Sequence, residues 1–211
     1  MPTIVVGGHS RNVGKTSVVA GIISALREKN WLAIKITQYG HGICSADGGA
    51  CDCVTDDHTM ALMEEHDRSG KTDTSRFLVA GASRVLWART RQGYLAELMP
   101  RLREQITRAE NVIVESNSVM RFLQPDIYVS VLDPGVKDFK LSAKEFLDRA
   151  DILIVQKTDK CQWEGVSDKL MGRGRVFVVS PPRYVTEEIV AEIRARLARV
   201  QRIKPRAEFV S

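Results

Sequence analysis

The sequence predicts an α/β fold: a doubly wound, mainly parallel sheet with helices on both of its faces. Short apolar runs that suit buried strands recur along the chain, for example Ile4–Val6, Val112–Val114 and Ile152–Val155. Stretches in which apolar residues follow a helical spacing separate several of these runs, as between Leu95 and Ile106. Strands that alternate with helices favour a parallel sheet, because parallel neighbours need a crossover segment between them.

The chain is expected to form one domain over residues 1–200, with a loop insertion rich in cysteine and glycine at about 38–57 and a basic tail at 201–211. A length of 211 residues suits one such domain. Strands are expected at 3–6, 31–37, 83–89, 111–115, 126–133, 151–155 and 175–179. Helices are expected from residue 15 to about 28–30, at 58–67, at 92–109, from 142, and from 187 to about 200.

Three local signals concern the ends and continuity of these helices. Pro100 should kink or divide the helix at 92–109, because proline removes a backbone donor. Ser142 and Glu145 have the spacing of a capping box, which predicts the start of a short helix. Thr186 precedes two glutamates and is expected to cap the final helix.

Composition limits the classes of function. The net charge of +5 is mild and suits an anionic ligand, whereas the arginines of the final helix lack the interleaved aromatic residues that nucleic-acid binding favours. No apolar run is long enough to span a bilayer, so no membrane partner is expected. We expect a cytoplasmic protein, in which the four cysteines stay reduced.

The segment that follows the first strand carries the strongest functional signal. Two glycines, Gly7 and Gly8, end the strand, and Gly14-Lys15-Thr16 opens a helix. A glycine-bounded turn before a helix N-terminus suits phosphate oxygens, because backbone N–H groups and the helix dipole both favour anions. The residues expected to bind a nucleoside triphosphate are Asn12, Val13, Gly14, Lys15, Thr16 and Ser17.

Charged residues near other strand ends complete the predicted site. Glu115 closes an apolar strand and is expected to bind Mg²⁺ together with Thr16, with Asp73 as an additional ligand. Lys35 lies near the end of the second strand, where ligands of parallel sheets bind, and is expected to reach phosphates or a substrate anion. The expected catalytic residues are Lys15, Lys35 and Glu115.

The segment after the strand at 151–155 indicates the base. Gln156-Lys157-Thr158-Asp159 resembles the Asn-Lys-x-Asp motif of guanine-nucleotide proteins, with glutamine in place of asparagine. Asp159 would accept hydrogen bonds from guanine, which adenine cannot donate, and the stem of Lys157 would pack on the base. GTP is therefore favoured over ATP.

The loop insertion holds a second group of ligand-type residues. Cys44, Cys51 and Cys53 lie in a glycine-rich stretch between two histidines. Thiolates with imidazole suit Zn²⁺ or an iron–sulfur cluster, although this spacing matches no common zinc motif. Incidental reduced cysteines are the alternative.

Taken together, these segments resemble the P-loop NTPases of the signal-recognition/MinD/BioD (SIMIBI) class, and within it the MobB family, molybdopterin-guanine dinucleotide biosynthesis protein B. The resemblance rests on Gly8–Thr16, Ile34–Thr37, Gly70–Arg76 and Val112–Glu115. It implies a homodimeric, slow GTPase that assists molybdenum cofactor biosynthesis, with a molybdenum cofactor enzyme or another accessory protein as partner. The chain departs from the family in the cysteine-rich loop and at Ser116, where a glycine is usual.

Two other functions stay open. In an ATP-dependent ligase or amidase, as in dethiobiotin synthetase, Lys35 would orient a carboxylate and the turn at 180–182 would hold adenine. In a metallochaperone GTPase, the nucleotide would gate a metal held by the cysteine-rich loop. In every version, His9 and Arg11 are expected to face solvent, a partner or a second subunit.

Overall fold

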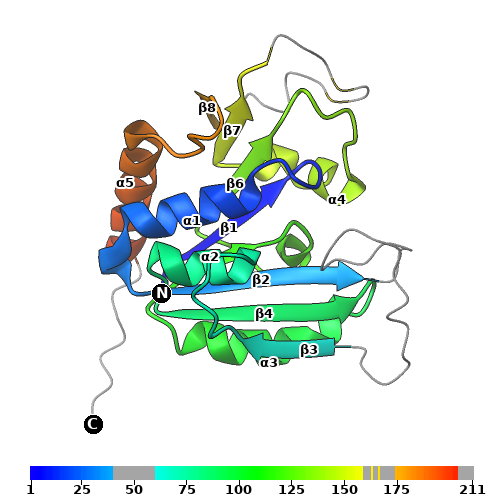
Figure 1. Cartoon of the computed structure of the whole chain (residues 1–211), viewed down its shortest axis with the longest axis vertical. Helices are drawn as coiled ribbons and strands as arrows, with labels where there is room; N and C mark the ends of the chain where they lie inside the picture. The colour runs from blue at the N-terminus through cyan, green and yellow to red at the C-terminus, as the bar shows by residue number, and fades with distance from the viewer. Residues whose placement is uncertain (40–59, 159–162, 164–165, 167–173, 204–211) are drawn as a thin grey trace.

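We describe the protein from a computed structural model, in which residues 1–39, 60–158, 163, 166 and 174–203 are described. Within these ranges the strands form one sheet of eight, in the order β3-β4-β2-β5-β1-β6-β7-β8 (Figure 1). Neighbouring strands are parallel except at one edge, where β3 is antiparallel to β4. The predicted doubly wound, mainly parallel α/β fold is confirmed.

The strands are β1 (Thr3–Gly8), β2 (Trp31–Tyr39), β3 (Met60–Glu64), β4 (Arg84–Arg91), β5 (Asn111–Glu115), β6 (Ile127–Leu132), β7 (Ile152–Gln156) and β8 (Arg175–Val179). The α-helices are α1 (Lys15–Ala25), α2 (Asp73–Ala80), α3 (Leu95–Thr107), α4 (Leu141–Lys144) and α5 (Glu187–Ile203). Short 3₁₀ turns are η1 (Arg27–Lys29), η2 (Ser118–Arg121) and η3 (Leu147–Arg149).

The sheet buries both faces, so its central strands are apolar throughout. Along β1, Ile4 and Val6 pack into a core with α1, α2 and α5, whereas Val5 packs into a second core with α3. This alternation follows from the two-residue repeat of a strand. Figure 1 shows α1 and α2 over one face of the sheet.

The order of the strands positions the site. β1 lies between β5 and β6, and the chain reaches these two neighbours only after building the β2–β4 side of the sheet. The strand order therefore reverses its direction of growth at β1, and in open parallel sheets such a reversal leaves a crevice at the carboxyl ends of the strands. The loop from Gly8 to Lys15 lies at that end of β1.

Three local expectations were wrong. The apolar stretch beginning at Met60 is a strand, because five residues pair with β4 along the sheet edge. Helix α3 continues through Pro100, which lies on the exposed face beside Ala96, where the carbonyl that loses its partner can bond water. Ser142 does not cap α4, whose N-cap is Lys140 and makes no side-chain cap bond.

The start of α5 agrees with expectation. The Ile189 backbone N–H donates to the Thr186 hydroxyl over 3.4 Å, and the Val190 N–H donates to the Thr186 carbonyl over 3.1 Å. The helix runs to Ile203, beyond the expected end near residue 200. Residues 204–211 of the predicted basic tail lie outside the described part of the chain. Among the described residues, no helix is long and apolar enough to cross a membrane.

Candidate functional site

The phosphate loop, Gly8–Lys15, turns directly from β1 into α1. Gly14 has a φ of 89°, a left-handed conformation that L side chains adopt rarely. A Cβ at Gly14 would also lie 2.1 Å from the ring of Tyr184, which packs on the loop. The first backbone N–H groups of α1 have no partner within the helix, so they can bind the oxygens of an anion. The positive φ and the close contact with Tyr184 together require glycine at position 14.

The start of the loop is held by Asn117, which the sequence interpretation missed. Its side-chain amide accepts a hydrogen bond from the Gly8 N–H over 2.8 Å and donates to the Gly8 carbonyl over 2.7 Å. A Cβ on Gly7 would lie 2.1 Å from the Asn117 Oδ1 atom, so the preceding glycine makes room for this contact. The only signal in the sequence was a polar residue two positions after Glu115.

His9 is fully buried, which corrects the expectation that it faces solvent. Its Nδ1 donates to the Asp138 carbonyl over 2.8 Å, and its ring packs against Phe139 and Trp163 at centroid distances of 5.1 and 5.0 Å. The Asp138 carboxylate also accepts a 2.6 Å hydrogen bond from Ser10. The segment after β6 therefore fixes the position of His9 in this loop. Sequence periodicity gave no sign of it, because the contact spans 129 positions.

Gln156 reaches the far end of the loop. Its buried side-chain amide donates to the Val13 carbonyl over 2.9 Å. The residue that replaces asparagine in the resembled motif thus contacts the phosphate loop from the end of β7. Lys157 follows on the exposed surface, and Asp159 lies outside the described residues.

Three strands bring the charged residues of the predicted metal site together. Glu115 pairs in register with Val6 on β1 and with Lys35 on β2. Its carboxylate accepts a 2.9 Å hydrogen bond from the Thr16 hydroxyl and a 3.1 Å bond from the Lys35 ammonium. Lys35 also forms an ion pair with Asp73 at the start of α2. All four predicted residues, far apart in sequence, form one continuous network.

The first turn of α2 also contacts α1. Arg76 donates a 3.0 Å hydrogen bond to the Ser17 hydroxyl and lies 3.9 Å from the Asp73 carboxylate. A capping box orients this turn, in which Thr72 and Ser75 exchange hydrogen bonds. Arg76 was not singled out as a site residue from the sequence, although it ends the Gly70–Arg76 segment on which the family resemblance rests.

The two lysines of the site are in different electrostatic situations. Burial lowers the pKa of Lys15 to about 8, and the nearby Glu115 charge offsets this only in part. The Lys15 ammonium donates to the Ser10 carbonyl over 2.5 Å. Burial would also lower the pKa of Lys35, but Glu115 and Asp73 together raise it above the ordinary lysine value. The charged form of Lys15 would therefore be stabilised more by an added anion than that of Lys35, which already has two counter-ions.

The donor set suits Mg²⁺, a hard cation that prefers oxygen ligands and uses few carboxylates when phosphates supply the rest. Thr16 and Glu115 lie in contact, and the carboxylates of Glu115 and Asp73 converge on one cation, the Lys35 ammonium. Among the described residues, no three His, Cys, Asp or Glu side chains group as a metal site on their own. A metal bound by Thr16, Glu115 and Asp73 would complete its coordination with oxygens from water or from a phosphate ligand.

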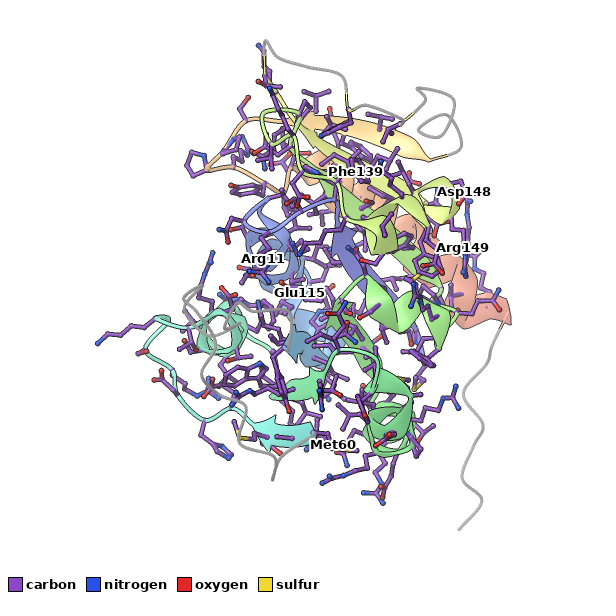
Figure 2. The ribbon with its side chains drawn as sticks, turned by 90° about the vertical axis from the view of Figure 1, so that its right-hand side faces the viewer. Arg11, Met60, Glu115, Phe139, Asp148 and Arg149 are labelled. Carbon is purple, nitrogen blue, oxygen red and sulfur yellow. The ribbon has the colours of Figure 1, made fainter. Side chains whose placement is uncertain are left out.

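A cleft of about 1310 Å³ opens over these residues. Lys15, Lys35 and Glu115 line it, and so do Arg11 and Lys140 on the side of the segment after β6. The Lys140 pKa is lowered by burial and by the neighbouring Arg11 charge, so the two cations disfavour one another. Figure 2 shows Arg11 and Glu115 near the middle of the molecule, with Met60 on the edge strand. The cleft is predominantly cationic, as a polyphosphate requires.

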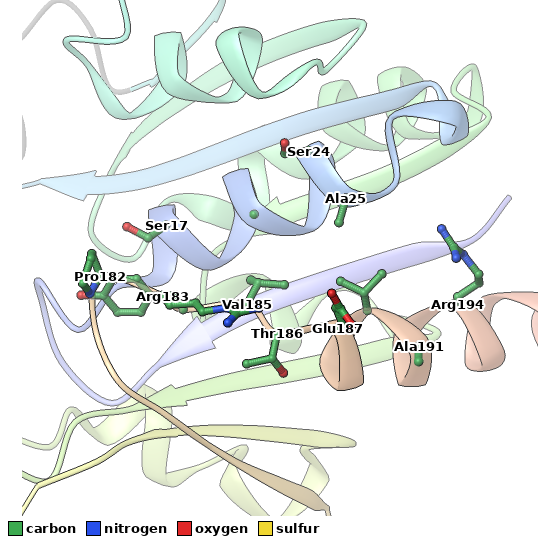
Figure 3. Close-up of a pocket in the computed structure, with 13 residues that line it drawn as sticks. Ser17, Ser24, Ala25, Pro182, Arg183, Val185, Thr186, Glu187, Ala191 and Arg194 are labelled. Atoms are coloured by element: carbon green, nitrogen blue, oxygen red, sulfur yellow. The ribbon is translucent and has the colours of Figure 1, made fainter.

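A smaller cavity of about 550 Å³ lies behind the phosphate loop, between α1 and the start of α5. Ser17, Ser24 and Ala25 line it from α1, and the segment 182–187 closes the other side (Figure 3). Tyr184 borders both this cavity and the large cleft. The two hollows therefore share one wall.

Cys44, Cys51 and Cys53 lie outside the described residues, as do the histidines that flank them. The predicted Zn²⁺ or iron–sulfur site in this loop therefore remains an expectation from the sequence.

Comparison with known proteins identifies the fold. No family model matches the chain, and no curated protein sequence matches it. Among solved structures, the hydrogenase maturation factor HypB of Archaeoglobus fulgidus is 13% identical with a TM-score of 0.52, covering 93% of this chain and 90% of that one. LpxK of Aquifex aeolicus, solved with ATP, is 18% identical with a TM-score of 0.46, covering 96% and 67%. MobB of Bacillus subtilis is 17% identical with a TM-score of 0.43, covering 93% and 98%.

The match to the Archaeoglobus fulgidus HypB structure agrees with the observed sheet architecture. The chain has the fold of the P-loop NTPases, as the sequence resemblance implied. At these identities the comparisons establish the architecture only.

Proposed function

We propose that the protein is a Mg²⁺-dependent nucleoside triphosphatase that favours GTP. The observation that carries this proposal is the contact between Thr16 and Glu115 at the N-terminus of α1, directly beside Lys15. It joins a hydroxyl and a carboxylate, both Mg²⁺ ligands, to a backbone that suits phosphates.

Each group has a definite role in this proposal. The amides of residues 13–17 bind the phosphate oxygens, and the Lys15 ammonium neutralises charge on the β- and γ-phosphates. Thr16 and Glu115 hold the metal, with Asp73 as a further ligand. When bound, Mg²⁺ neutralises charge that develops on the phosphate oxygens during transfer. Asn117 and Gln156 keep the loop backbone in one conformation, so that the donors are oriented before the ligand arrives.

Base selection is the finer part of the proposal. Gln156 contacts the loop at Val13, and Lys157, the next residue, is exposed. Asp159, three positions after Gln156, is proposed to accept hydrogen bonds from guanine. Hydrolysis without a partner protein is expected to be slow, on the order of 10⁻⁴ to 10⁻² s⁻¹, as in GTPases that lack an activating partner.

Direct binding of labelled GTP and ATP in the presence of Mg²⁺ tests the proposal. Lys15→Ala should weaken binding of both by roughly 100-fold, because truncating a desolvated charge partner costs about 2–5 kcal/mol. Asp159→Asn should weaken GTP binding and leave ATP binding unchanged. Lys71→Ala removes an exposed lysine outside the cleft and serves as the control.

The outcomes separate the alternatives. If neither nucleotide binds above background, the proposal fails. If ATP binds and GTP does not, base selection by Asp159 is wrong and the ligase or amidase function is favoured, with Lys35 lining the same cleft as the phosphate loop.

The pathway proposal rests on the sequence resemblance alone. It makes the protein a homodimeric accessory protein of molybdenum cofactor biosynthesis, as the MobB-like segments imply. Sedimentation of the full-length protein with and without GTP would test the dimer, and analysis of co-purified small molecules for a pterin would test the pathway. A monomer that carries no pterin would contradict both.

The cysteine-rich loop supports one competing function, a metallochaperone GTPase. Three cysteines between positions 44 and 53 could supply soft ligands. Metal analysis of protein purified without chelator or affinity-tag nickel tests this. Lack of stoichiometric metal, with no change in Cys51→Ser/Cys53→Ser, would remove this function.

A further inference from the structure

The Lys35 ammonium lies where the carboxylates of the site converge. It is 3.1 Å from a Glu115 oxygen and forms an ion pair with Asp73. The other Glu115 oxygen accepts the hydrogen bond from Thr16. Glu115 is only 6% exposed, and a carboxylate buried to this extent needs a nearby positive charge. Lys35 supplies that charge from the polypeptide itself.

We propose that Lys35 is a built-in competitor of the divalent cation: its ammonium occupies the position between Glu115 and Asp73 and must leave when a divalent metal binds. The inference rests on the proposed metal site and goes beyond it, because it assigns Lys35 to control of metal affinity. Lys35 is a positioning residue in this role, since it holds both carboxylates at one point.

Charge and geometry make the competition unavoidable. A divalent cation bound to Glu115 and Thr16 would lie within a few ångströms of the present Lys35 ammonium, and like charges at that distance repel strongly in a partly buried site. The side chain must therefore move.

The cleft offers the displaced ammonium a destination. Lys35 lines the cleft, and its side chain is 17% exposed, so a change of rotamer can turn it toward a bound polyphosphate. Asp73 is 46% exposed and remains connected to α1 through Arg76, which contacts Ser17. Polyphosphate and metal then cooperate, because the first supplies a counter-ion for the lysine that the second displaces.

Mn²⁺ binding to the nucleotide-free protein, followed by electron paramagnetic resonance of the free ion, tests the inference. Lys35→Gln should bind Mn²⁺ at least 10-fold more tightly than the wild type, because the competing charge is gone. Lys71→Gln removes the same charge from an exposed position two residues before Asp73, and it should match the wild type. Adding Glu115→Gln to Lys35→Gln should abolish the gain. Equal or weaker Mn²⁺ binding by Lys35→Gln would overturn the inference.

A second measurement on the wild-type chain does not depend on the folding of a variant. Acetylation of Lys35 by a water-soluble reagent, quantified by mass spectrometry, should become faster when Mn²⁺ saturates the site, whereas acetylation of Lys71 should not change. An unchanged rate at Lys35 would overturn the inference.

The two proposals fail in distinguishable ways. Loss of nucleotide binding would end the NTPase proposal whatever the Mn²⁺ result. Normal nucleotide binding together with unaltered Mn²⁺ affinity in Lys35→Gln would leave the NTPase proposal intact and refute competition by Lys35.

Discussion

The phosphate loop and the helix start that follows it divide into two halves, Gly8–Val13 and Lys15–Ser17, which are held by different kinds of contact. In the first half, from Gly8 to Val13, backbone groups are bonded by the neutral amides of Asn117 and Gln156. In the second half, from Lys15 to Ser17, side chains join a network of charges. The first set of contacts pairs backbone groups with buried or half-buried side-chain amides. The second set faces the cleft.

This difference separates stability from response to ligand. Backbone groups in the first half must be paired in every state of the protein, since an unpaired buried group costs free energy. Charged groups in the network of the second half can exchange one counter-ion for another at a small cost in free energy. Lys35 on β2, which belongs to this network, would do so when a metal binds. We therefore expect variants of the first half to affect folding, and variants of the second half to affect binding.

Asn117→Ala should give the largest effect on stability. It leaves both polar groups of the Gly8 backbone without this partner, at an expected cost of about 2–4 kcal/mol in the free energy of unfolding. Denaturant unfolding measures this. Asn117→Asp keeps the acceptor but loses the donor and should fall between the alanine variant and the wild type. Ser118→Ala is the neighbouring control: it removes one 3.1 Å hydroxyl contact with Ser116 and should cost no more than about 1 kcal/mol. An Asn117→Ala variant as stable as this control would show that the Asn117 amide does not stabilise the first half of the loop.

Acidification should weaken the first half through His9. Burial lowers the pKa of His9 from 6.5, outweighing the Asp138 carbonyl and the Asp133 charge, which favour the protonated ring, while Lys15 disfavours it. The unfolded chain therefore takes up this proton at a higher pH than the folded chain. The contribution of neutral His9 to the free energy of unfolding is fully present above pH 6.5 and is lost as the pH falls through the folded-state pKa of His9.

The measurement is denaturant unfolding at about pH 7.5 and about pH 5.5, on either side of the unfolded-state pKa. His9→Phe keeps an aromatic ring against Phe139 and Trp163 but cannot titrate. Its free energy of unfolding should fall less on acidification than that of the wild type. Equal losses in the two proteins would show that His9 contributes nothing to acid sensitivity.

Arg76→Ala should give the smallest effect on stability, below about 1 kcal/mol, because its contacts with Ser17 and Asp73 are partly exposed. Its nucleotide affinity in the presence of Mg²⁺ should nevertheless fall several-fold. Arg84→Ala breaks a similarly exposed ion pair with Glu64, at the amino-terminal end of β4 and outside the cleft. It should leave nucleotide binding unchanged. A loss of stability as large as that of Asn117→Ala would show that both halves support the folded backbone.

Local sequence was sufficient to select the residues that the structure brings together in the candidate site. Gly14, Lys15 and Thr16 are recognisable because a phosphate site needs these residue types next to each other on one helix start. Glu115 and Lys35 are recognisable because each lies at the end of an apolar strand, and parallel strands bring such ends to one edge. The structure then shows them in register on β5 and β2.

The errors have a common cause. The stretch at Met60 has a helical spacing but pairs with β4 at the sheet edge, so long-range pairing outweighed a short local pattern. His9 was expected to face solvent, a partner or a second subunit, yet it is buried against Phe139 and Trp163, far along the chain. Asn117 had no recognisable motif, because its partner is the backbone of Gly8.

The sequence by itself determined the α/β class and indicated the phosphate loop and the residues of the proposed metal site, because these depend on residue type and on spacing within single segments. Only the tertiary structure decided which groups hold the loop and that Lys35 lies between two carboxylates. Those contacts join Lys35 to Asp73, 38 positions away, and to Glu115, 80 positions away. Their geometry follows from the order of strands in the sheet, which no local pattern specifies.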